Sequence, residues 1–189
     1  MSHVDVGRRS PSGRAAGLRD PLLLAAAGRR SAPEARAGRE GGGRAPVAAN
    51  LSAFALFFLS LLAFSGGTEA LQALAGCLLA LAGAGLVLRS RAELGAAWSL
   101  VPRADAGTGL VTTGPYRLVR HPIYLGLALI AAGNALAFAS WPALGIVLFG
   151  IVPTFAWRAR TEERLLGRIF GERYAAYRQR TGMIIPRLP

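Results

Sequence analysis

Long runs without a charged residue constrain this chain more than any other feature of its sequence. Residues 47–65 are uncharged and mostly apolar, and a second uncharged run covers residues 70–88 after the short segment 66–69. Each run is about as long as a helix needs to cross the hydrocarbon core of a bilayer. Backbone groups in that core must bond to one another, so helices are the expected structure of both runs.

Two further apolar runs lie in the second half of the chain. They cover residues 122–140 and 142–157, and Trp141 separates them. Both are on the short side for a membrane span, so we expect a tilted helical hairpin. The sequence therefore predicts an all-α integral membrane bundle of about four transmembrane helices.

Polar segments follow the second and fourth runs. Residues 89–113 form the expected cytosolic loop, and residues 158–189 form the expected cytosolic tail. Apolar residues recur at helical spacing in the tail, which predicts an amphipathic helix that Gly171 interrupts. These residues are Leu165, Leu166, Ile169, Phe170, Tyr174 and Tyr177. Such a tail would lie on the membrane surface or cover the polar loop.

The distribution of arginine gives an independent indication of topology. All 22 basic residues are arginine, and none lies between Arg44 and Arg89 or between Arg120 and Arg158. Each gap brackets a pair of apolar runs. Since basic residues collect on the cytoplasmic side, we expect both termini and the loop to be cytoplasmic in a multi-pass protein of a bacterial inner membrane.

The net charge of +12 raises the alternative of nucleic-acid binding. The arginines are dispersed along the membrane edges with few interleaved aromatic residues, so anionic membrane lipid is the expected partner and nucleic acid is not. Residues 1–46 carry nine arginines against four acidic residues and are rich in Gly, Ala, Ser and Pro. We expect a disordered basic arm there and a membrane domain over residues 47–189.

One polar stretch, Gly114–Gly126, lies where the loop meets the third apolar run. It contains two residues each of Pro, Gly, Tyr and Arg, with His121 among them. Pro122 suits the first turn of a helix, where a missing N–H costs nothing. Charged and titratable groups at a membrane edge cost free energy, so they indicate a functional site. The simpler alternatives are a neutral imidazole at His121, interfacial anchoring by Tyr116 and Tyr124, and snorkelling of Arg120 and Arg158 to phosphates.

A second polar group, Arg158–Glu163, follows the fourth run and would face the same side. Glu162 and Glu163 could bind a cationic or hydroxyl-rich ligand. Alternatively, Thr161 caps a helix whose dipole favours acids in its first turn. The chain has one cysteine, Cys77, and no Cys/His cluster, so no metal site is expected.

Residues 110–126 closely resemble the central signature of the isoprenylcysteine carboxyl methyltransferase family, which is related to the phospholipid methyltransferases. Residues 158–163 and 170–177 resemble the tail of the same enzymes, with matching order and spacing. The resemblance covers about residues 70–189.

The resemblance implies S-adenosylmethionine as methyl donor, bound at the cytosolic face, and a lipophilic small molecule or lipidated acceptor. It identifies Arg158 as the catalytic, substrate-side arginine. The implied cofactor-binding residues are Leu110, Val111, Tyr116, His121, Pro122, Ile123, Tyr124, Glu162 and Glu163. Carboxylates suit the ammonium or ribose of this cofactor, and tyrosine faces suit its sulfonium.

The residues slightly favour a carboxylate as the methyl acceptor. A carboxylate is ionised at pH 7 and needs only orientation, for which Arg158 is suited. An amine or thiol would need a base, and His121 is the obvious one. Two other functions stay open: a lipid or sterol-type reductase of the same fold, and a non-enzymatic membrane protein that recruits anionic lipid.

Overall fold

The computed structural model describes residues 44–95 and 109–187, so almost all of the expected basic arm, residues 1–46, lies outside the described residues. The helices are α3 (Arg44–Ala63), α4 (Ala70–Leu94), α5 (Pro122–Ala137), α6 (Trp141–Ile146), α7 (Val152–Phe170) and α8 (Glu172–Arg180), with the 3-10 helix η2 (Gly114–Arg117) and the π-helical turn η3 (Val147–Ile151). The described part of the chain contains no β-strand, only a single bridge between Val119 and Gly182.

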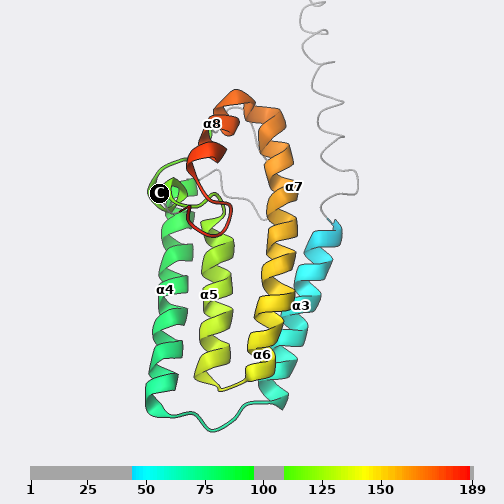
Figure 1. Ribbon diagram of the computed structural model, residues 1–189, viewed down its shortest axis with the longest axis vertical. Helices are drawn as coiled ribbons and strands as arrows, with labels where there is room; N and C mark the ends of the chain where they lie inside the picture. The colour runs from blue at the N-terminus through cyan, green and yellow to red at the C-terminus, as the bar shows by residue number, and fades with distance from the viewer. Residues whose placement is uncertain (1–43, 96–108, 188–189) are drawn as a thin grey trace, which may run out of the picture. The chain divides into compact units, whose positions relative to one another are not determined.

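Four helical columns stand side by side, formed by α3, α4, α5 and the continuous α6–η3–α7 (Figure 1). Consecutive columns run in opposite directions. Three helices are long and apolar enough to cross a membrane, Ala45–Ala63, Ala70–Leu94 and Trp141–Phe170, and α5 is a shorter apolar helix. The predicted all-helical membrane bundle is confirmed.

Two packing surfaces hold the columns together. Helices α4 and α5 meet through glycine: a Cβ on Gly133 would lie 2.5 Å from the carbonyl oxygen of Gly76. Such close approach is common where helices pack inside lipid. On the other side of α5, Phe57, Ile151 and Phe155 are at most 2% exposed and form the core shared by α3, η3 and α7.

Large apolar side chains cover the outside of the bundle. Leu62 and Phe149 are each 85% exposed, and most outward leucines of α3 and α4 are more than half exposed. A surface this apolar is what a bilayer, rather than water, would solvate.

The last column differs from the expected span and tail. The expected span ended at residue 157, but the helix continues without a break to Phe170, and Gly171, with a φ of 51°, separates it from α8. Pro153 is accommodated by the wider turn η3, in which the N–H of Val152 bonds to the carbonyl of Val147. Thr161 is inside the helix and donates to the carbonyl of Trp157, so it is not a cap.

The chain returns after α7 to the start of α5. Helix α8 and the segment after it lie over the ends of α4 and α5 (Figure 1). There the N–H groups of Arg120 and His121 donate to the carbonyls of Gly182 (2.8 Å) and Met183 (3.0 Å). This contact brings the C-terminal residues beside the polar stretch that precedes the third apolar run.

Candidate functional site

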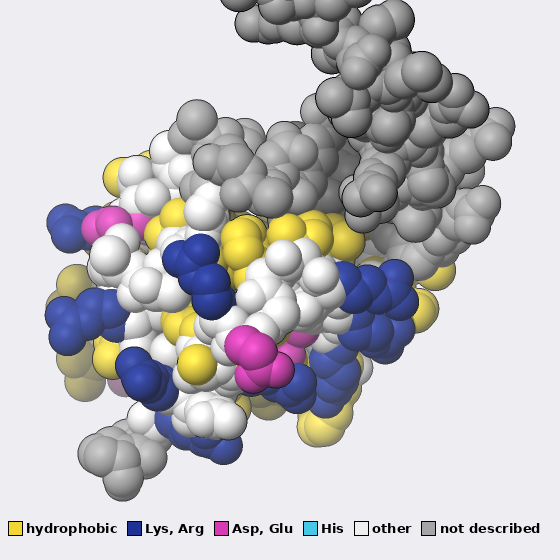
Figure 2. Space-filling view, turned by 90° about the horizontal axis from the view of Figure 1, so that it is seen from above, with side chains coloured by type: hydrophobic (Ala, Val, Ile, Leu, Met, Phe, Trp, Pro, Cys, Tyr) yellow, Lys and Arg dark blue, Asp and Glu magenta, His cyan; other side chains and the backbone are white. Residues whose placement is uncertain are grey.

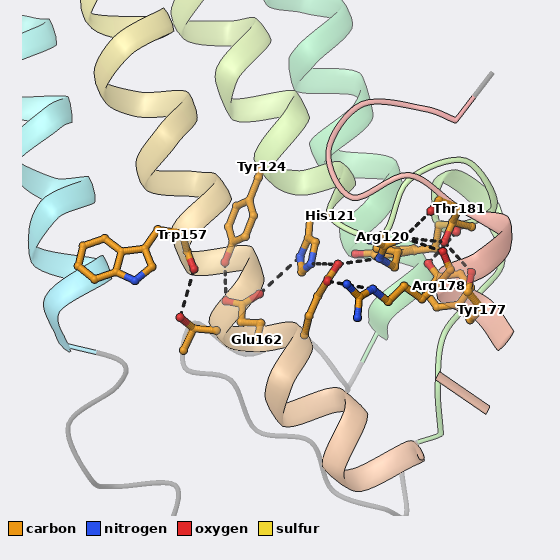
Figure 3. A network of polar contacts seen from close by, with 11 residues as sticks. Arg120, His121, Tyr124, Trp157, Glu162, Tyr177, Arg178 and Thr181 are labelled. Carbon is orange, nitrogen blue, oxygen red and sulfur yellow. Dashed lines mark hydrogen bonds and ion pairs between the residues drawn. The ribbon is translucent and has the colours of Figure 1, made fainter. Parts of the chain in front are cut away.

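The site lies where α5 begins beside α7. His121 is the N-cap residue of α5 and Tyr124 is in its first turn, while α7 supplies Arg158 and Glu162 (Figure 3). The Tyr124 hydroxyl donates to Glu162 Oε1 over 2.5 Å, and Arg158 Nε donates to the same oxygen over 3.2 Å. The other oxygen, Glu162 Oε2, lies 3.6 Å from His121 Nδ1. One carboxylate is therefore held by groups from two helices.

Three aromatic rings stack beside this carboxylate. The Tyr124 ring is within 10° of parallel to both His121 and Phe155, with centroid distances of 5.5 and 4.9 Å. The Arg158 guanidinium carbon lies 5.7 Å from the Tyr124 centroid. Tyr124 therefore contacts protein through its ring and presents its hydroxyl to Glu162.

Glu163 has different surroundings from Glu162. Its Oε1 accepts from Arg120 Nε over 2.7 Å, both side chains are 8% exposed, and Arg178 Nε lies 3.7 Å from Oε2. His121 Nε2 lies 3.6 Å from Glu163 Oε1 and has no hydrogen-bond partner among the described residues. The imidazole of His121 thus lies between the two carboxylates.

Tyrosines attach α8 to the segment before α5. The Tyr177 hydroxyl donates to the carbonyl of Tyr116 in η2 over 2.7 Å. Burial raises the pKa of Tyr177 to about 12, with Glu163 adding to the rise and Arg120 opposing it. Burial is also the main cause of the raised pKa values of Tyr116 and Tyr174. These phenols stay protonated at neutral pH and can act as hydrogen-bond donors.

The remaining predicted residues lie at the same end of the bundle. Leu110 and Val111 are half-buried in the segment before η2, and Pro122 and Ile123 complete the first turn of α5. Figure 2 looks onto this end, where arginine side chains are spread around a few acidic ones. A hollow of about 580 Å³ opens here between α7 and α8, and Glu163, Tyr174 and Arg178 are among the residues that line it.

Sequence reasoning missed the part played by Arg120 and by the residues around Thr181. Arg120 was interpreted as a snorkelling side chain, but it is paired with Glu163 and bonded to the end of α8. The available signal was weak: an acid in an arginine-rich tail needs a cationic partner if it is buried, but its sequence position does not say which one.

Comparison with known proteins gives matches across the same region. The family model described as phospholipid methyltransferase matches residues 71–173. The protein-S-isoprenylcysteine O-methyltransferase of Schizosaccharomyces pombe is 37% identical over 82 residues, which cover 42% of this chain and 34% of that protein. Methanethiol S-methyltransferase 1 of Bradyrhizobium diazoefficiens is 42% identical over 76 residues, covering 38% of this chain and 24% of that protein.

A solved structure has the same fold. It is that of the eukaryotic intramembrane Ras methyltransferase named isoprenylcysteine carboxyl methyltransferase, and it superposes with a TM-score of 0.59 at 23% identity. The match covers 74% of this chain and 51% of that one. The chain spans about a third of the length of the first curated relatives that it matches. These matches confirm the resemblance indicated by residues 110–126 and 158–177.

Proposed function

Since the chain belongs to the phospholipid methyltransferase family, we propose that it is a membrane-embedded methyltransferase that uses S-adenosylmethionine and acts on a lipophilic acceptor. The observation that carries the proposal is the convergence of His121, Tyr124, Arg158 and Glu162 at the polar end of an apolar helical bundle. An aqueous cofactor and a lipid-dissolved acceptor can meet at such a boundary.

The side chains of the site fit the proposed cofactor. The cofactor carries an ammonium group and a ribose diol, and carboxylates bind both well. His121 Nε2 is a buried polar atom without a partner among the described residues, and a bound polar group would satisfy it. When bound, the cofactor would supply an electrophilic methyl group on a sulfonium. The proposed binding residues are Leu110, Val111, Tyr116, His121, Pro122, Ile123, Tyr124, Glu162 and Glu163.

Within this set, the two glutamates have separate roles in the proposal. Glu162 is the ligand-facing carboxylate in this proposal, because its side chain is 19% exposed, against 8% for that of Glu163, and Tyr124 and Arg158 hold it through Oε1. Glu163 has the supporting role, since its charge is balanced by Arg120. The ring of Tyr124 stacks on His121 and Phe155, so the hydroxyl of Tyr124, and not the face of its ring, contributes to the proposed site.

We assign Arg158 to the acceptor. Its guanidinium has five N–H donors, of which Nε donates to Glu162, and the same planar group can orient an acceptor carboxylate beside the cofactor. A carboxylate needs no deprotonation, so orientation is the main contribution required of the chain. Among the relatives, one name specifies O-methylation and another specifies S-methylation. A thiol acceptor would require a base, and His121 beside two carboxylates would be that base.

Titration calorimetry with S-adenosylhomocysteine tests the cofactor proposal on detergent-purified protein. We expect wild type to bind, and Glu162→Gln to bind at least tenfold more weakly because the ligand-facing charge is lost. Arg160→Gln, an exposed arginine on the same helix, is the matched control and should bind like wild type. A folded wild type that binds NADPH and not S-adenosylhomocysteine would instead support the reductase alternative.

The acceptor class can be tested with lipid extracts and isotope-labelled S-adenosylmethionine. We expect label in a lipophilic product that mild alkali releases as methanol, as a methyl ester requires. Arg158→Gln should retain S-adenosylhomocysteine binding and lose this product. Label that resists alkali would reject the carboxylate and favour a thiol or amine acceptor.

A further inference from the structure

The Arg120 side chain is buried, and burying a charge has a large desolvation cost. Its side chain and that of Glu163 are each 8% exposed, and the two are joined over 2.7 Å. A buried ion pair is favourable only when further hydrogen bonds satisfy the N–H groups and oxygen lone pairs that the two ions do not use on each other. The surroundings of Arg120 should therefore show which parts of the chain depend on its charge.

The rest of the guanidinium donates hydrogen bonds to carbonyl groups at the end of α8. Arg120 Nη1 donates to the carbonyls of Arg178, over 3.1 Å, and of Thr181, and lies 3.5 Å from Thr181 Oγ1 (Figure 3). The last carbonyls of a helix lack partners within it, and the helix dipole favours a cation there. One side chain from the start of α5 thus joins α7 to the end of α8.

The backbone beside Arg120 is bonded to the same part of the chain. Residues 181–184, the C-terminal strap, accept from the N–H groups of Arg120 and His121, and the N–H of Gly182 donates to the carbonyl of Leu118 over 3.2 Å. Ile184 anchors the strap in the core at 9% exposure. The position of His121 therefore depends on the strap as well as on α5.

We propose that Arg120 is a positioning residue, which holds the C-terminal strap against the start of α5 and thereby sets where His121 and Glu162 stand. This inference rests on the proposed function, because the site that it positions is the proposed cofactor site. Arg120 acts through its neighbours: the strap bonds the backbone of His121, and the ion pair fixes Glu163, which adjoins Glu162 on α7.

Three variants and a control test the proposal. Arg120→Gln removes the charge, and Arg120→Lys keeps it but lacks the planar fork that reaches Glu163 and α8 together. Gly182→Ala disturbs the strap without touching any charge, because a Cβ there would lie 1.8 Å from the carbonyl oxygen of Ile185. The control is Arg117→Gln, an exposed arginine three residues before Arg120.

The readouts are amide hydrogen exchange in residues 118–121 and 181–184 and affinity for S-adenosylhomocysteine, both measured well below the unfolding temperature. We expect Arg120→Gln and Gly182→Ala to exchange faster in both segments and to bind about tenfold to a hundredfold more weakly, as misplaced binding groups do. Arg120→Lys should recover part of the affinity, and Arg117→Gln should match wild type in both measurements.

Three results would overturn the proposal. Unchanged exchange in Arg120→Gln would show that Arg120 does not hold the strap. Faster exchange with an affinity within twofold of wild type would show that the strap does not position the site. A folded wild type that fails to bind S-adenosylhomocysteine would reject the proposed function and with it the positioning of a cofactor site, whereas the exchange arm would still measure the contact between Arg120 and the strap.

Discussion

Glu162 and Glu163 are adjacent in sequence, but a helix turns about 100° per residue, so their side chains point in different directions. Glu162 is 19% exposed and meets Tyr124 and Arg158. Glu163 is 8% exposed and meets Arg120. The structure therefore separates the two carboxylates, at the scale of single residues, by their partners and by their exposure.

This separation predicts that two similar substitutions differ in their effects on stability and on binding. Glu163→Gln leaves the Arg120 charge buried without its counter-ion and should lower the free energy of unfolding by about 3 kcal/mol. Glu162→Gln should lower it by less than about 1 kcal/mol, yet abolish most S-adenosylhomocysteine binding. Thermal unfolding and calorimetry on the same detergent samples measure both. Equal destabilisation by the two variants would contradict the separation.

The buried phenols predict a loss of stability at high pH. Tyr177 has an ordinary pKa of about 10 when unfolded and of about 12 when folded, so its stabilising contribution is complete below about pH 10 and is lost as the pH rises toward 12. The unfolding temperature of wild type should fall steeply above pH 10. Tyr177→Phe should show a smaller fall, because one buried phenol that resists ionisation is gone. An identical pH dependence would show that Tyr177 ionises freely.

Residue-level prediction from sequence has limits that have a physical cause. The family signature indicated His121, Tyr124 and Glu162 as site residues. In the structure both His121 and Tyr124 lie beside Glu162. The second role of Arg120 was not predictable, because its acceptors at Arg178 and Thr181 are backbone carbonyls. Every residue has such a carbonyl, so the sequence carries no sign of the contact.

At the scale of elements, α7 connects the membrane bundle directly to the site. Sequence composition changes sharply at Arg158, which predicted a boundary between span and tail. Helical hydrogen bonding does not depend on that change. No further proline stands between Pro153 and Gly171, and the helix accommodates Gly167. The column therefore continues, and Arg158, Glu162 and Glu163 are fixed relative to Phe155 in the core.

The contact between α4 and α5 predicts another element-scale result. Gly133→Ala would place a Cβ 2.5 Å from the Gly76 carbonyl oxygen and 2.6 Å from the Ala80 nitrogen, both backbone atoms that cannot move aside. The helices must separate, at a cost of about 1–3 kcal/mol in unfolding free energy. Gly85→Ala, on α4 with open space around it, is the control and should be neutral or slightly stabilising. A Gly133→Ala protein as stable as this control would show that the close contact is not required.

At the scale of the whole molecule, the fold and the charge distribution agree. Because consecutive columns alternate in direction, the starts of α3 and α5 and the ends of α4 and α7 lie at one end of the bundle (Figure 1). The described arginines belong to those ends, to the segment before α5, and to α8 and the residues after it. The turns at the opposite end, residues 64–69 and 138–140, contain no arginine. The positive-inside rule then favours a cytoplasmic polar end.

Cysteine labelling in intact bacterial cells tests this orientation. In a Cys77→Ser background, Gly67→Cys lies in a turn at the arginine-free end, and Arg173→Cys is exposed on α8. We expect a membrane-impermeant maleimide to label Gly67→Cys in intact cells and Arg173→Cys only after lysis. The opposite pattern would reverse the topology. Since S-adenosylmethionine is made in the cytoplasm, a reversed topology would also separate Glu162 from its proposed ligand, so this experiment tests the proposed function and the orientation together.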